Sequence, residues 1–144
     1  MKFDRAFQPT DIEVVQLRAT QSRGTDKHVT WTVGYAPTLI EEAPEPMRVI
    51  LGTLHAGGKK GHADVTVGAV FIHQDEAISS DDLEEAIREC DATETLYDIA
   101  RTHLSPLLAT VGASVKLPRK SPAAEVNQLE RRDSEDVDSS SQPD

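Results

Sequence analysis

Histidine is the residue type in this chain best suited to chemistry, because imidazole is a common ligand of transition metals. Of the five histidines, His55 and His62 flank one predicted hairpin and can face each other across it, whereas His73 stands at the far end of the second strand. At about 3.3 Å per residue, His73 lies roughly 30 Å or more from His62. At most two ligands can meet, and a structural zinc site uses four. We therefore interpret these histidines as polar ends of a hairpin and expect no metal and no cofactor.

The other reactive residue types lack the arrangement that catalysis needs. The run from Gly57 to Gly61 connects two strands and lacks the spacing of a phosphate-binding loop, so it predicts a turn. Cys90 has no nucleophile signature around it and is expected on a helix face. Neighbouring acids such as Glu41 and Glu42 fall in a loop, where carboxylates face solvent. We predict no catalytic residue, and we do not expect an enzyme.

Length and charge limit the classes of function. The 144 residues suffice for one domain with a single core, and 15 basic against 25 acidic residues give a net charge of -10, which repels nucleic acid. A lone cysteine and the lack of a secretion signal or a long apolar run predict a cytoplasmic protein that does not insert into membranes. With only six aromatic residues the core must be aliphatic and modest, so association of subunits is a natural way to bury more apolar area.

Four segments predict strands of an antiparallel sheet. Apolar and polar side chains alternate along residues 11–20 only if one residue near Val15 is extra, which indicates a bulge. Residues 28–35 alternate cleanly, with Val29, Trp31, Val33 and Tyr35 on one face. Residues 47–55 and 64–73 carry apolar groups on both faces, which predicts that both faces are covered. The run between them predicts a tight hairpin whose glycines supply positive φ angles.

After the strands the spacing becomes helical. Ser79 is a predicted N-cap of a short helix that ends near Cys90. A longer apolar stripe from Leu96 to Val111 predicts the main helix, with Gly112 at its end. Pro106 removes one hydrogen bond, so we expect a bent helix or two shorter ones. This stripe is more often core than binding groove.

The chain divides into three predicted parts. Residues 1–10 form an N-terminal tail, residues 11–122 form the α+β domain, and residues 123–144 form an acidic, mostly disordered tail. Residues 121–144 hold seven acids against two arginines, a net charge of -5. A short helix at 123–132 is an alternative for the start of the tail.

The order of these pieces resembles the SecB chaperone family. The similar segments are His28-Val-Thr-Trp-Thr-Val-Gly-Tyr, a proline-broken loop, Met47-Arg-Val-Ile-Leu-Gly-Thr-Leu and Ala63-Asp-Val-Thr-Val-Gly-Ala-Val-Phe. Further on, the leucine-aromatic-x-x-Ala-Arg pattern of that family is similar to Leu96-Tyr97-Asp98-Ile99-Ala100-Arg101. The crossover between the first two strands is reduced to about residues 22–27, and this shorter form resembles the SecB-like chaperones of toxin-antitoxin systems.

The resemblance implies a four-stranded antiparallel β-sheet with helices packed on one face, in dimers that pair into a tetramer. It also implies an ATP-independent holdase that binds unfolded or partly folded clients in apolar grooves, among them a preprotein or an antitoxin. A translocation motor ATPase is a further partner that the resemblance leaves open. Eight residues are the predicted apolar contacts for clients or for the helix-sheet core: Val29, Trp31, Val33, Tyr35, Leu96, Tyr97, Ile99 and Leu104.

Two other classes of function stay open at this point. A small-molecule-binding or enzymatic α+β domain would enclose a pocket between the sheet and the bent helix. A structural or inhibitory oligomer subunit would use the same apolar surfaces to bind copies of itself or a host protein.

Overall fold

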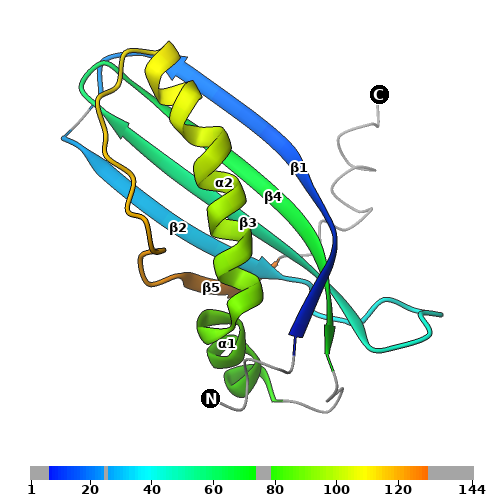
Figure 1. Ribbon diagram of the computed structural model, residues 1–144. Helices are drawn as coiled ribbons and strands as arrows, with labels where there is room; N and C mark the ends of the chain where they lie inside the picture. The colour runs from blue at the N-terminus through cyan, green and yellow to red at the C-terminus, as the bar shows by residue number, and fades with distance from the viewer. Residues whose placement is uncertain (1–6, 25, 74–78, 130–144) are drawn as a thin grey trace, which may run out of the picture.

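A computed structural model describes residues 7–24, 26–73 and 79–129 (Figure 1). One mixed sheet has the strand order β1-β4-β3-β2-β5, and α2 crosses one of its faces, here called the inner face (Figure 1). The opposite face is called the outer face. The elements are β1 (Phe7–Gln21), β2 (His28–Tyr35), β3 (Met47–Gly58), β4 (Gly61–His73), α1 (Ser80–Glu89), α2 (Asp91–Thr110) and β5 (Glu125–Gln128). The predicted α+β class is thus confirmed.

The first four strands pair antiparallel over the predicted segments, but β1 begins at Phe7, so residues 7–10 of the predicted N-terminal tail belong to the sheet. β2 spans the predicted residues 28–35, and the bulge in β1 is confirmed. Val14 pairs with Val67 and Gln16 pairs with Thr66, so Val15 is the extra residue between them. A second irregularity lies between Thr10 and Glu13.

The hairpin between β3 and β4 is antiparallel as predicted, but its glycines are needed for another reason. Among the glycines in the described ranges, Gly112 alone has a positive φ, of 75°. Gly57 is needed for space, because a Cβ there would lie 2.6 Å from the Cβ of His62 on the neighbouring strand. The prediction of positive φ in the hairpin was wrong, since a lysine pair forms the turn and the glycines belong to the strands.

Local hydrogen bonds mark the start of α1 and the end of α2. The Ser79 hydroxyl accepts a hydrogen bond from the Asp82 amide at 3.3 Å, which confirms the predicted cap of α1. α2 continues through Pro106 as one helix, so of the two predicted alternatives, a bent helix or two shorter ones, the second was wrong. It ends in the hydrogen-bond pattern of a Schellman motif, in which the Gly112 and Ala113 amides donate to the Ala109 and Leu108 carbonyls. No helix in the described ranges is long and apolar enough to cross a bilayer.

The predicted four-stranded antiparallel sheet was wrong in its strand count. β5 adds a fifth strand beside β2 and runs parallel to it, with Val126 opposite Val33. This strand lies where a short helix was the alternative for residues 123–132, and residues 130–144 of the predicted tail lie outside the described ranges. Val126 is the one buried side chain of β5, so the strand carries almost no sequence pattern of its own.

An extended strap, residues 112–124, brings β5 to the edge of the sheet (Figure 1). Three side chains of the helices hold it: the Tyr97 hydroxyl donates to the Pro118 carbonyl at 2.5 Å, the Glu94 carboxylate accepts from the Ser121 amide at 3.0 Å, and Arg88 donates to the Ala124 carbonyl at 3.4 Å. These contacts satisfy polar groups of an extended segment that neighbouring strands do not pair with, and they return the chain to β2.

The core lies between α2 and the inner face of the sheet. The rings of Trp31 and Tyr97 meet edge to face at a centroid distance of 5.4 Å. Gly52 lets the indole lie flat on β3, because a Cβ at this position would come within 2.5 Å of the ring. Trp31 is therefore fixed between a strand and a helix.

Candidate functional site

The predicted apolar contacts gather on the inner side of the sheet. Six of the eight are buried between sheet and helices, namely Trp31, Val33, Tyr35, Leu96, Tyr97 and Leu104. Val29 and Ile99 are partly buried and pack against the same core. Their role as client contacts stays a prediction, and the structure assigns them core packing.

The outer face of the sheet carries an apolar surface at the end where α1 lies. This surface, here called the apolar half, consists of Val15, Met47, Val49, Leu51, Val70 and Ile72. Val15 is 52% exposed and Val49 is 36% exposed. No helix of the described residues covers this face (Figure 1). The side chain of Leu129 packs over Gly34 beside it.

Strand register explains how the apolar half arises. Val49 pairs with Val70 and Met47 pairs with Ile72, so the outward positions of β3 and β4 stack into rows. The inward positions Ile50 and Ala69 are also apolar, because they pack into the core. These strands therefore carry apolar residues at both parities, as predicted, but within the described residues helices cover only the inner face.

The other half of the outer face is polar. Thr53 and Thr66 face each other across β3 and β4 with their hydroxyl oxygens 2.9 Å apart. Beyond them, near the hairpin, three histidines form a cluster, here called the histidine cluster: His28, His55 and His62. The outer face thus changes from apolar to polar along the strands.

Asp64 anchors the histidine cluster. Its carboxylate lies 3.6 Å from the Nδ1 atom of His55 and 3.6 Å from the Nε atom of Arg18. Burial, assisted by the neighbouring His28, lowers the pKa of His55, while Asp64 opposes this effect. The sequence predicted that His55 and His62 lie close together, but it did not predict that His28 joins them. The loop after β2 is long, so the register of β2 on β3 could not be derived from the sequence.

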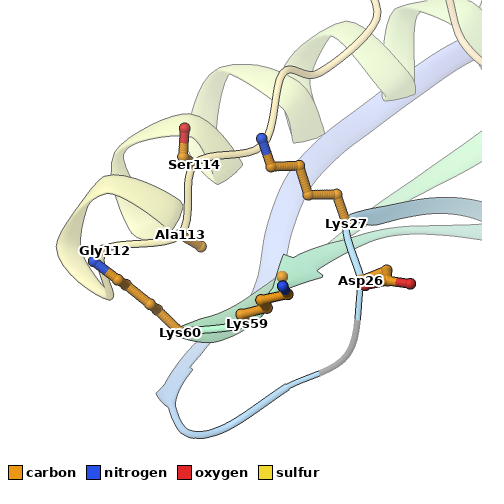
Figure 2. A pocket seen from close by; sticks show the side chains of 8 residues that line it. Asp26, Lys27, Lys59, Lys60, Gly112, Ala113 and Ser114 are labelled. Atoms are coloured by element: carbon orange, nitrogen blue, oxygen red, sulfur yellow. The ribbon is translucent and has the colours of Figure 1, made fainter.

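A cavity of about 400 Å³ opens beside the same hairpin (Figure 2). Lys27, Lys59 and Lys60 line it, and Figure 2 shows Lys27 and Lys60 reaching toward the segment from Gly112 to Ser114. This segment follows the C-terminal end of α2, whose carbonyl groups form the negative end of the helix dipole. The positive charges of the lysines complement this negative end. An anion bound in the cavity would be repelled by the same helix end. We therefore do not assign the cavity a ligand.

Two hydrogen bonds of polar side chains lie on the inner side of the sheet near α1. The Tyr35 hydroxyl donates to the Glu84 carboxylate at 2.6 Å, and Arg48 donates to the Ala36 carbonyl at 2.6 Å. Burial and the Glu84 hydrogen bond raise the pKa of Tyr35 to about 12. Burial also raises the pKa of the Cys90 thiol. The prediction that Cys90 lies on a helix face was wrong, because it is the extended residue between α1 and α2.

Comparison with known proteins finds a similar fold. No model of a protein family matches the sequence, and no curated protein sequence matches it. Among solved structures, the chain is similar to the SecB-like chaperone of Mycobacterium tuberculosis, determined in complex with a ChAD peptide from the HigA1 antitoxin. The TM-score is 0.54 at 16% identity, over 85% of this chain and 99% of the other. The protein therefore shares the fold of a SecB-like chaperone.

Proposed function

We propose that this protein is a SecB-like holdase that binds unfolded or partly folded polypeptides without ATP and without catalysis. The apolar half of the outer face is the observation that carries the proposal. A holdase needs an apolar surface for exposed client segments and a charged exterior that keeps the complex dissolved. Val15 and Val49 supply the first, and the net charge of -10 supplies the second.

The shape of the apolar half suits an extended client. Its side chains stand in rows across β1, β3 and β4, and a segment in extended conformation presents a side chain to one face at every second residue. The contact needs no fixed sequence, because apolar burial is not directional. A loosely specific binder of unfolded segments is the expected result.

The similar solved structure suggests a more specific client. Because that chaperone is seen with a peptide from an antitoxin, we propose an antitoxin segment as a client class for this protein as well. The alternative is a set of exported preproteins. The homo-oligomer, a dimer of dimers, and a motor ATPase as partner stay predictions.

Suppression of aggregation tests the proposal. A chemically denatured test protein is diluted into buffer with rising amounts of the chain, and light scattering is recorded. We expect the wild type to suppress aggregation and Val49→Asp to require several-fold more protein, because a charge in the apolar half must be desolvated when a client binds. Thr32→Asp is the matched control, since it adds the same charge to the polar part of the same face.

The result that contradicts the proposal is also clear. Wild type that leaves aggregation unchanged, or a Thr32→Asp variant as impaired as Val49→Asp, would remove the apolar half from the function. Solution mass, measured in parallel, separates the rival: a monomer whose melting temperature rises with a small molecule favours a ligand-binding domain. Binding of antitoxin segments against preprotein segments then decides the client class.

A further inference from the structure

We propose that His28 and His55 form a binding site for one divalent transition-metal ion, such as Zn²⁺ or Ni²⁺, that links β2 to β3 on the outer face. The site lies in the polar half, near the hairpin, and is separate from the apolar half. It does not depend on the chaperone function. The two imidazoles are already placed as ligands of a shared ion would be.

Strand register brings the two side chains together. His28 pairs with Gly57, and Thr30 pairs with His55, so the histidines stand diagonally on neighbouring strands and on the same face. Gly57 leaves the space between them open, because a Cβ there would lie 3.1 Å from Cε1 of His28. The rings then lie with centroids 5.1 Å apart and planes inclined by 26°.

The distance between the nitrogens fits a shared ion. The Nε2 atoms of His28 and His55 are 3.1 Å apart. Two imidazole nitrogens at about 2.05 Å from a tetrahedral ion are about 3.3 Å apart, and on a square or octahedral ion about 2.9 Å. The observed separation lies between these values, so an ion needs only a small shift of either ring.

The opposite ring nitrogens, the two Nδ1 atoms, each face an oxygen acceptor, which favours the tautomers that leave the Nε2 atoms free to act as ligands. The Nδ1 atom of His28 is 3.0 Å from the carbonyl oxygen of Asp26, which can only accept, so this nitrogen carries the proton. The Nδ1 atom of His55 faces the Asp64 carboxylate at 3.6 Å. A histidine ligand commonly donates its second N–H to a carbonyl or a carboxylate, which fixes the ring and raises its basicity. Here a carbonyl lies beside Nδ1 of His28 and a carboxylate lies beside Nδ1 of His55.

Without a metal ion, the 3.1 Å contact between the two Nε2 atoms is a hydrogen bond, in which one ring carries its proton on Nε2. When both rings are neutral with their protons on Nδ1, neither Nε2 atom has a proton to donate, and both lone pairs are available to an ion. A metal ion would therefore replace this hydrogen bond after a small shift of the rings.

The site has two protein ligands. His62 lies 5.5 Å from His55 between ring centroids, and no group of three or more His, Cys, Asp or Glu residues within the described ranges is arranged to hold an ion. Water fills the remaining positions, so we expect micromolar affinity rather than the tighter binding of a four-ligand structural site. The sequence predicted no metal because a structural zinc site uses four ligands, and His28 could not be placed beside His55 without the strand register.

Calorimetric titration of the full, untagged chain with zinc chloride tests the site. We expect about one ion per chain with micromolar affinity, and a loss of at least tenfold in His28→Ala and in His55→Ala. His103→Ala is the matched control, because His103 is exposed on α2 and should leave the titration unchanged. Circular dichroism shows whether each variant folds.

A second variant keeps the test decisive if the alanine variants fail to fold. Asp64→Asn keeps both ligands but weakens the support of His55, so its zinc affinity should fall about tenfold. The melting temperature of the wild type should rise with zinc, and that of the His28 variant should not. Unchanged affinity in either histidine variant, or no binding at millimolar zinc, would overturn the proposal.

Discussion

The two faces of the sheet show how the same strands carry two kinds of information. The inner face is apolar along β2, β3 and β4 and is covered by α2, so its side chains determine whether the chain folds. The outer face is apolar at one end and polar at the other, and no described helix covers it. Residues that alternate along a strand can therefore be considered separately, with one parity in the core and the other on the outer face, where we propose that clients bind.

Trp31→Ala should give the largest effect on the inner face. Loss of a fully buried indole leaves a cavity between Gly52 and Tyr97, and such truncations cost about 3–5 kcal/mol of unfolding free energy. Urea denaturation measures the loss. The folded fraction of the variant should suppress aggregation as the wild type does. Weakened suppression with intact stability would make Trp31 a client contact after all.

Tyr97→Phe should have a smaller effect, confined to the strap. It removes the hydrogen bond to the Pro118 carbonyl and keeps the ring packed on Trp31, so the expected cost is about 1–2 kcal/mol. Hydrogen exchange should become faster at the Leu129 amide, which donates to the Tyr35 carbonyl, and stay unchanged in β3. Equal acceleration in both strands would show that the strap does not open separately.

Tyr35 gives a prediction on pH that leaves the protein unchanged at neutrality. Burial and the hydrogen bond to Glu84 raise its pKa from 10.0 to about 12. The neutral phenol is favoured in the folded state, so its contribution is fully present below pH 10 and is lost as the pH rises through about 12. Unfolding free energy should decline over this window in the wild type. The decline should be shallower in Tyr35→Phe, and parallel curves for the two proteins would refute the assignment.

Much of the fold could be predicted because it depends on local spacing. Strict alternation of apolar and polar residues predicted both ends of β2 correctly. The break in alternation at Val15 predicted the bulge, and Ser79 predicted the start of α1. β5 could not be predicted, because its one buried residue makes no pattern and its pairing depends on the contacts of Tyr97 and Glu94 with the strap. Contacts of this kind join residues more than 20 positions apart.

The candidate site was predictable in part for the same reason. Apolar residues at both parities of β3 and β4 indicated a second apolar surface, but the named contacts came from the cleaner pattern of β2 and α2, which belongs to the core. The partnership of His28 with His55 required the register of β2 on β3. The loop of residues 36–46 between these strands is too long for sequence to fix that register.

The strand order has a practical consequence for spectroscopy. β1 and β5 are the first and last strands and also the two edges, about four strand spacings or 19 Å apart. Phe7 and Gln128 both lie toward the end of the sheet that carries the apolar half, and Gln128 is about seven residues, or 23 Å, along the strands from His62. A fluorophore at one edge and an acceptor at the other would report distances across the sheet. A spin label at either edge would lie closer to a client on the apolar half than to an ion at the histidine cluster.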